Sequence, residues 1–109
     1  LSSFDAYINV AGGFKLDEPA ADLGVVAAIA SSFRNKKINP STVFFGEVGL
    51  TGEVRAVNQM DKRITESLRL GFKRCIVPVM NMKTVADFTK GIDIIMVSTV
   101  EEALSSALS

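Results

Sequence analysis

The segment "FFGEVGLTGEVRAV", residues 44–57, decides the fold of this chain, because it sets two Gly-Glu pairs in an apolar and β-branched background. The pairs begin at Gly46 and Gly52, six residues apart. β-Branched runs that are interrupted by glycine are typical of strands and tight turns. We therefore expect two strands that are joined near residues 49–52.

The same segment could carry chemistry as a phosphate cradle or as a pair of catalytic carboxylates. A phosphate-binding loop follows a strand and opens a helix, but here strand follows strand, and Gly-Lys-Ser/Thr occurs nowhere in the chain. Glu47 and Glu53 flank the turn, yet nothing around them predicts a raised pKa. The spacing favours a structural interpretation, in which Gly46, Gly49 and Gly52 allow a positive φ or a bulge that bends the ribbon.

The composition is that of one globular domain spanning residues 1–109. Hydrophobic residues make up 48% and charged residues 22% of the chain, which excludes a disordered or fibrous protein. Twelve basic and twelve acidic residues cancel, so no global field attracts nucleic acid or an acidic membrane. No apolar run approaches the roughly 18 residues of a membrane-spanning helix, and we expect no signal peptide.

Reactive residue types are scarce. The chain has no histidine, so a Ser-His-Asp triad, a histidine metal site and an imidazole proton shuttle are excluded within it. Cys75 is the one cysteine and has no disulfide partner in the chain, which indicates a reducing cytoplasm. We expect Cys75 to be a small core residue and no metal to be bound. Four methionines are expected to pack in or against the core: Met60, Met80, Met82 and Met96.

Strands and helices alternate along the chain. "FDAYINVAGG" alternates apolar and polar residues and ends in two glycines, which predicts a half-buried strand. A helix is predicted over about residues 19–33, with Pro19 in its first turn and Asn35 beyond its end. Its expected buried stripe is Leu23, Val26, Ala27, Ala30 and Phe33, flanked by Val25 and Ile29.

The second half of the chain continues this alternation. "MDKRITESLRLG" predicts a helix closed by glycine, with Met60, Ile64 and Leu68 on its apolar side. "KRCIVPV" and "DIIMVST" are predicted strands, and "NMKTVADFTKG" is a short helix between them. "TVEEALSSALS" predicts a final helix that Ser98 or Thr99 could cap. The order β-α-β-β-α-β-α-β-α predicts an α/β fold in the loose, α+β sense, with helices packed on a mixed sheet.

Four blocks of sequence are informative through their individual residues as well as through the spacing of their apolar positions. They are "FDAYINVAGG", "EPAADLGVVAAIASSFRNK", "GEVGLTGEVR" and "RITESLRLGFKRCIVP". In this order they resemble the C-terminal domain of the RadA (Sms) family of bacterial DNA-repair proteins. That domain is itself similar to the proteolytic domain of Lon proteases. The resemblance covers nearly the whole chain and implies the Lon-protease-domain fold, which agrees with the predicted element order.

Lon peptidases cut with a serine that a lysine activates, and the resemblance implies that this chain has lost both. In the family pattern the serine stands in a Gly-Pro-Ser-Ala-Gly turn, and the lysine follows a Gly-Gly-Leu step. Here "DEPAADLG" keeps Pro19 and puts Ala20 at the serine position. "AVNQMDKRI" replaces the glycines with Asn58 and Gln59 and puts Asp61 at the lysine position. A methyl group has no lone pair and an ionised carboxylate has no proton to give, so a catalytically inactive domain is implied.

Neighbouring residues do not restore this chemistry. Lys62 is adjacent to Asp61, but one residue along a helix turns the side chain by about 100°. Asp17, Glu18 and Asp22 crowd the start of the first helix with negative charge, which suits the helix dipole and hinders a peptide oxyanion.

Six basic residues gather around the second helix, with Asp61 and Glu66 against them. By themselves they indicate a solvated helix face with ion pairs between its side chains, such as that of Glu66 with Lys62. Since the resemblance implies a ring-shaped assembly that handles DNA, they also become candidate phosphate contacts. The candidates are Arg55, Lys62, Arg63, Arg69, Lys73 and Arg74.

The resemblance implies a longer protein with a four-cysteine zinc finger and a RecA-like ATPase that acts in recombinational repair and branch migration. ATP, magnesium and zinc would belong to that protein, and no cofactor is expected in this domain. We expect the domain to hold a homo-oligomeric, hexameric ring through small exposed residues of its first helix and hairpin, and to contact single-stranded or branched DNA.

Three other functions are weighed against this one. A Lon-type ATP-dependent serine peptidase would need serine and lysine at Ala20 and Asp61. A bare DNA-binding module is disfavoured by the zero net charge. A pseudo-protease that binds peptide without cutting it stays open.

Overall fold

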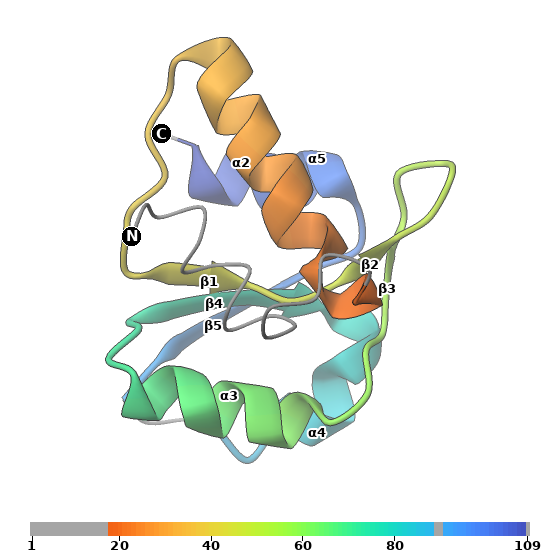
Figure 1. Cartoon of the computed structure of the whole chain (residues 1–109). Helices are drawn as coiled ribbons and strands as arrows, with labels where there is room; N and C mark the ends of the chain where they lie inside the picture. The colour runs from red at the N-terminus through yellow and green to blue at the C-terminus, as the bar shows by residue number, and fades with distance from the viewer. Residues whose placement is uncertain (1–17, 89–90, 109) are drawn as a thin grey trace.

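The computed structural model describes residues 18–88 and 91–108, in which a parallel sheet lies between two layers of helices (Figure 1). The first elements are η1 (Pro19–Ala21), α2 (Asp22–Arg34), β1 (Thr42–Phe44), β2 (Glu47–Val48), β3 (Val54–Arg55) and α3 (Met60–Arg69). They are followed by β4 (Arg74–Pro78), η2 (Val79–Asn81), α4 (Met82–Val85), β5 (Asp93–Val97) and α5 (Val100–Ala107). The strand predicted in "FDAYINVAGG" lies outside the described residues.

The described strands form two separate sheets. β1, β4 and β5 pair in parallel in the order β1-β4-β5, whereas β2 and β3 form an antiparallel hairpin. The α/β class with both kinds of pairing is confirmed. The first of the two strands expected to join near residues 49–52 is split at Gly46, because Phe45 N–H still donates to the carbonyl of Ile76 in β4 (2.9 Å), whereas Glu47 already pairs with Arg55 in the hairpin.

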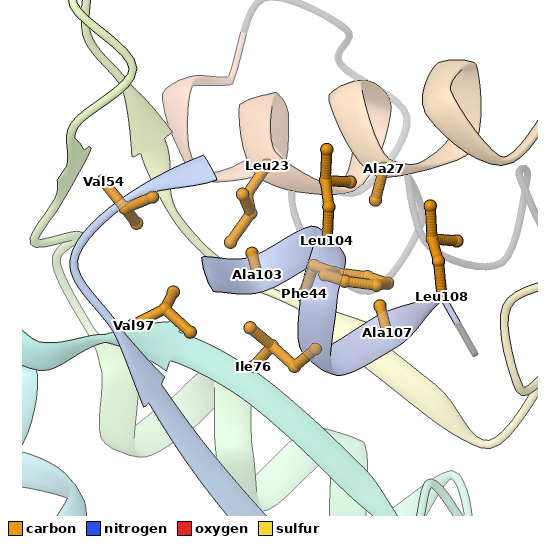
Figure 2. Close-up of a cluster of buried hydrophobic side chains, with 10 residues drawn as sticks. All are labelled: Leu23, Ala27, Phe44, Val54, Ile76, Val97, Ala103, Leu104, Ala107 and Leu108. Atoms are coloured by element: carbon orange, nitrogen blue, oxygen red, sulfur yellow. The ribbon is translucent and has the colours of Figure 1, made fainter. Parts of the chain in front are cut away.

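Helices cover both faces of the parallel sheet, with α2 and α5 on one side and α3 and α4 on the other (Figure 1). Because successive strand residues point to opposite faces, the strands contribute to two apolar clusters. On the α2 and α5 side, Phe44 lies in the middle of the first cluster, below Leu23 and Leu104 (Figure 2). Ile76 of β4 and Val97 of β5 complete this cluster on the side of the sheet.

The second cluster packs the opposite face of the sheet on α3 and α4. Met60 and Ile64 are buried on the inner side of α3, as predicted, and Leu68 packs against them partly buried. The strand residues of this cluster are Val43, Phe45, Cys75 and Val77. Burial on both faces explains why these short strands read as continuous apolar runs in the sequence.

α2 departs from its predicted burial at its C-terminal end. Leu23 and Ala27 are buried as predicted, and Asn35 ends the helix with a left-handed φ of 52°. Phe33, however, is 90% exposed and Ile29 59% exposed, so the predicted burial of Phe33 is wrong. The last turns of α2 rise away from the sheet, so the described part of the sheet does not cover them (Figure 1).

The later helices differ from prediction mainly in length. α3 is closed by Gly71, whose φ is 90°. The helix predicted over "NMKTVADFTKG" shortens to a 3-10 turn and one α-helical turn that ends at Val85. α5 begins with a capping box, in which Thr99 Oγ1 accepts from the N–H of Glu102 (3.1 Å) and Glu102 Oε1 accepts from the N–H of Thr99 (3.2 Å). Of the two predicted caps, Thr99 is the one confirmed.

The methionines are a further correction. Met60 is buried, but Met80, Met82 and Met96 are exposed. Met80 and Met82 lie on the short turns of η2 and α4, and Met96 lies on β5, an edge strand of the parallel sheet. Edges and short turns leave side chains without a covering layer, which the apolar character of methionine does not reveal.

Candidate functional site

The candidate site lies around Ala20, at the serine position of the Lon serine-lysine dyad, where the start of the first helix meets the base of the hairpin. Gly46 N–H donates to the Ala20 carbonyl (3.1 Å), and Leu23 N–H donates to the Gly46 carbonyl (3.0 Å). A Cβ on residue 46 would lie 2.8 Å from Cγ1 of Val54 and 3.2 Å from Cδ2 of Leu23. Any side chain there would push helix and hairpin apart, so Gly46 serves a close backbone approach.

A pocket of about 340 Å³ opens beside these contacts. It is lined by Glu18, Pro19, Ala20, Glu47, Ala56, Val57 and Asn58. Ala20 is 1% exposed, and none of these residues carries a hydroxyl, a thiol or an amine. Asp61 is not part of this lining and is exposed in the first turn of α3. The structure thus places one predicted dyad position in the pocket and the other outside it.

Asn81 fixes the wall of the pocket, although no sequence pattern marks it. Its Nδ2 donates to the Val57 carbonyl (3.0 Å), and its Oδ1 accepts from the Val57 N–H (3.1 Å). The buried side-chain amide therefore satisfies both backbone groups of Val57, as a neighbouring strand would. The two residues are 24 positions apart, which is why local sequence reasoning missed this contact.

Arg63 holds the rim of the same pocket. Its Nη2 lies 3.1 Å from the Glu18 carboxylate, and its Nε donates to the Asn58 carbonyl (2.9 Å). This guanidinium joins α3 to the start of the first helix, so its charge is used within the chain. Two other acidic residues were predicted to lie at the start of the first helix. Asp22 accepts from the backbone N–H of Val48 in β2 (3.1 Å), and Asp17 lies outside the described residues.

The two hairpin carboxylates meet through Arg55. Its guanidinium lies 2.8 Å from Glu53 and 3.8 Å from Glu47. Glu53 Oε1 also accepts from Thr51 Oγ1 (2.6 Å) and from Thr51 N–H (3.1 Å). The Thr51 hydroxyl, followed by the Arg55 guanidinium, lowers the pKa of Glu53 to about 2. A carboxylate that acidic stays ionised at neutral pH and cannot serve as a general acid, so the geometry does not support catalysis by this pair.

The glycines of the turn make this arrangement possible. Gly52 has a φ of 84°, a left-handed conformation that favours glycine. A Cβ on residue 49 would clash with the carboxylate of Glu53, so Gly49 leaves room for that carboxylate to fold over the turn. The expected positive φ is therefore confirmed at Gly52, whereas Gly46 and Gly49 instead make room for neighbouring side chains.

Arg69 and Arg74, two of the candidate DNA contacts, are engaged within the chain. Arg69 pairs with Glu66 at 2.6 Å, in place of the predicted pair of Glu66 with Lys62. Arg74 Nη2 donates to the Ser106 carbonyl near the end of α5 (2.9 Å). Both guanidiniums thus stabilise helix ends or surface pairs.

Of the four remaining candidate DNA contacts, two are engaged within the chain and two are not. Arg55 and Arg63 are engaged with carboxylates, as described above. Lys62 and Lys73 are exposed, and neither makes an ion pair within the described ranges. The two lysines are therefore the members of the set whose charge is available to an outside partner.

Other site chemistry is sparse in residues 18–88 and 91–108. No cluster of three or more cysteine, aspartate or glutamate side chains there could hold a metal ion. Burial raises the pKa of the Cys75 thiol, so Cys75 is an unreactive core residue as predicted. No helix in these residues combines the length and the apolar character that crossing a membrane requires.

Comparison with known proteins places the chain in a family. The family model described as the Lon protease (S16) C-terminal proteolytic domain matches residues 2–109. Two proteins named DNA repair protein RadA, from Halalkalibacterium halodurans and Bacillus subtilis, are each 53% identical over 108 residues, which is 99% of this chain and 23% of each relative. A third, from Streptococcus pneumoniae, is 48% identical over 109 residues, which is 100% of this chain and 26% of that relative.

The chain spans about a quarter of the length of these relatives. Together with the α/β architecture, the matches confirm the resemblance that four blocks of sequence indicated. The chain belongs to the family of Lon protease C-terminal proteolytic domains, in the form found in proteins named DNA repair protein RadA.

Proposed function

We propose that this chain is a catalytically inactive Lon-like domain that serves assembly and DNA contact in a RadA-type DNA repair protein. One observation carries the inactivity: the pocket at the nucleophile position contains the methyl group of Ala20, and its described lining offers no hydroxyl, thiol or amine for the serine-lysine chemistry of Lon peptidases. Asp61, at the lysine position, is outside that lining. Loss of the nucleophile alone costs a serine protease on the order of a millionfold in turnover.

Hydrolysis of casein and of an unfolded fluorogenic peptide tests the inactivity. We expect no turnover from the chain itself or from Ala20→Ser, because a restored hydroxyl would still lack an amine to activate it. A thermal melt of Ala20→Ser is the control that the variant is folded. Turnover by the unmodified chain would contradict the proposal, and turnover by Ala20→Ser would show that another group serves as the base.

Assembly is the second part of the proposed function. Phe33, Ile29 and Leu50 are large apolar residues that the described fold leaves exposed. Exposed apolar surface of this kind marks sites of protein contact. We expected small exposed residues at the contact, and the described fold leaves these three large apolar residues exposed as well. Sedimentation velocity over a rising concentration series should show self-association, and a strict monomer at the highest concentration would argue against assembly by this domain alone.

DNA contact is the third part, and it rests on Lys62 and Lys73. Cations without an internal partner can neutralise phosphates, which gives affinity without sequence preference. A neutral chain with two such contacts would bind weakly by itself, and several copies in a ring would raise the apparent affinity through effective concentration.

The longer protein would supply the remaining activities. We propose that a zinc finger and a RecA-like ATPase lie in the part beyond this chain, that ATP, magnesium and zinc are bound there, and that the protein acts in the cytoplasm in homologous recombination and branch migration. This domain would then act within a hexameric ring on single-stranded or branched DNA.

A peptide-binding pseudo-protease is the second candidate, favoured by one observation: the pocket at Ala20 still measures about 340 Å³. Fluorescence anisotropy separates the two functions, with labelled single-stranded DNA in one titration and labelled unfolded peptide in the other. Binding of DNA with no response to peptide supports the first proposal. Tight peptide binding with no response to DNA supports the second.

A further inference from the structure

An apolar side chain stands at the tip of the β2–β3 hairpin without a contact in its own fold. Leu50 is 104% exposed, so no side chain of residues 18–88 or 91–108 shields it. The loop that carries Leu50 projects away from the helical layers (Figure 1). A leucine in this position gains nothing for the stability of the chain, whereas it offers an anchor to a partner.

The tip is held rigidly in place. Within the turn, Gly49 N–H donates to the Glu53 carbonyl (2.9 Å), and Gly52 N–H donates to the Gly49 carbonyl (3.0 Å). Val100 N–H donates to the Gly52 carbonyl (2.9 Å), which ties the turn to the start of α5. A preorganised tip loses little conformational entropy on binding, so more of its contact energy is kept as affinity.

A groove of complementary character lies on the C-terminal half of α2. It measures about 320 Å³ and is lined by Val26, Ile29, Ala30, Phe33 and Arg34. The aromatic ring of Phe33 is almost fully exposed in it. Four of the five lining residues are apolar, so an apolar side chain is what the groove is suited to hold.

The charges around the two surfaces are also complementary. Beside the tip, Glu47 and Glu53 face a single guanidinium, that of Arg55, which leaves one net negative charge. At the end of α2, three exposed cations stand close together in the sequence, and none makes an ion pair in the described part of the chain. These cations are Arg34, Lys36 and Lys37. Opposite charges steer an encounter and fix its register.

We propose that the Leu50 tip of one copy of this chain docks into the α2 groove of a second copy. The inference rests on the proposed assembly and names the two surfaces that would make it. In the head-to-tail arrangement that we propose, one tip enters one groove, and each pair keeps one free tip and one free groove. Repetition of such a contact closes a ring when the rotation between copies allows it. The leucine would be the centre of a larger contact, since a specific interface buries about 800 Å² per partner.

Complementation between two variants tests this contact. Leu50→Asp removes the tip and keeps the groove, whereas Phe33→Asp removes the groove and keeps the tip. Both side chains are exposed, so neither change removes a buried contact. By sedimentation velocity, each variant alone should self-associate about thirtyfold more weakly than the unmodified chain, the effect of losing one interface anchor. An equimolar mixture should form a one-to-one dimer and no larger species, because one variant supplies the tip and the other the groove.

Met80→Asp is the matched control, since it places the same charge at another exposed apolar side chain and should leave association unchanged. Association of Leu50→Asp at the level of the unmodified chain would overturn the inference, because the groove would then hold something other than the tip, such as the same groove of another copy. Unchanged association of both variants would overturn it as well and would leave the proposed assembly standing.

A cysteine pair keeps the inference testable if every sample sediments as a monomer, the result that would contradict assembly by the domain alone. Leu50→Cys and Phe33→Cys are mixed under mild oxidation. Cys75 is buried, so its thiol does not compete. We expect the disulfide between the two variants to form at least about tenfold faster than either symmetric disulfide, the ratio of one favoured encounter over random ones. Equal rates of the three disulfides would overturn the proposed contact.

Discussion

At the scale of single residues, the carboxylate of Glu53 determines how the hairpin responds to pH. Hydrogen bonds from Thr51 and the guanidinium of Arg55 lower its pKa from 4.5 to about 2. Because the pKa is lower in the folded chain, the stabilising contribution is complete above about pH 4.5 and is lost as the pH falls through about 2. We predict that the amide proton shift of Thr51, measured by NMR, titrates with a midpoint of about 2.

The variant Glu53→Gln should remove this titration and give Thr51 its low-pH amide shift at every pH. Asp87→Asn is the matched control, because Asp87 is exposed in the turn after α4 and its loss should leave the Thr51 titration in place. A Thr51 midpoint near 4.5 would show that the Glu53 carboxylate is not held by these donors in solution.

Gln59 occupies a backbone conformation that suits glycine. Its φ of 54° is left-handed, and such a conformation costs a non-glycine residue about 1–2 kcal/mol. Glycine loses about 0.5–1 kcal/mol more chain entropy on folding, so we predict a net gain of about 0.5 kcal/mol in the free energy of unfolding for Gln59→Gly. Lys62→Gly, at an exposed position inside α3, should instead lose about 1 kcal/mol.

Urea unfolding of the two glycine variants provides the measurement. A loss for Gln59→Gly as large as that for Lys62→Gly would mean that residue 59 does not hold a left-handed conformation in solution. The family pattern places a glycine in this step, and in this chain the left-handed position is occupied by Gln59.

At the scale of elements, the start of α5 depends on the side chain of Thr99. Its Oγ1 accepts from Glu102 N–H, which satisfies a backbone donor that the helix leaves open. We predict that Thr99→Ala lowers the free energy of unfolding by about 1 kcal/mol in urea titrations. Ser98→Ala is the control, because the carbonyl of Ser98 accepts from Val54 N–H (2.8 Å) while its hydroxyl makes no hydrogen bond in the described chain. Equal losses for the two variants would exclude the capping box as the cause.

The elements also show what sequence reasoning can reach. Periodicity located the inner sides of α2 and α3, because a 3.6-residue period reports which residues share a side of a helix. Periodicity predicted the burial of Phe33 wrongly, because it does not show how far the sheet under a helix extends. The last turns of α2 extend beyond the described sheet. Periodicity also missed the break at Gly46, because only the neighbouring Val54 and Leu23 side chains show why no Cβ fits there.

The residues of the candidate site also differ in whether the sequence could predict them. The motif comparison predicted that Ala20 stands at the serine position of Lon peptidases, because that position is defined by the residues next to it in the sequence. The contacts of Arg63 with Glu18 and of Asn81 with Val57 join residues 45 and 24 positions apart. Contacts of that range are set by topology, so no local pattern could have assigned them. The same reason explains why six basic residues looked alike in sequence, although the fold engages four of them.

At the scale of the whole molecule, charge decides how the domain could hold DNA. The net charge is zero, so no long-range field assists binding, and any affinity must come from individual phosphate contacts. Lys62 and Lys73 are exposed without an ion pair in the described residues, whereas Arg74 is bonded to the end of α5. Among the six candidate residues, the structure therefore separates two lysines without an ion pair in the described residues from four arginines that are engaged within the fold.

This separation predicts how DNA binding depends on salt. For the chain at low ionic strength, the slope of log K against log salt should fall by about 0.7 for each lysine removed, the value for one single-strand phosphate. Anisotropy titrations with labelled single-stranded DNA should show this fall for Lys62→Ala and for Lys73→Ala, and no change for the control Lys83→Ala, which removes the same charge from α4. Arg74→Gln should keep the slope and instead lower the urea midpoint, because the Ser106 carbonyl loses its donor. A slope that falls for Arg74→Gln and stays constant for both lysine variants would reverse the assignment and place the DNA on the α5 side of the sheet.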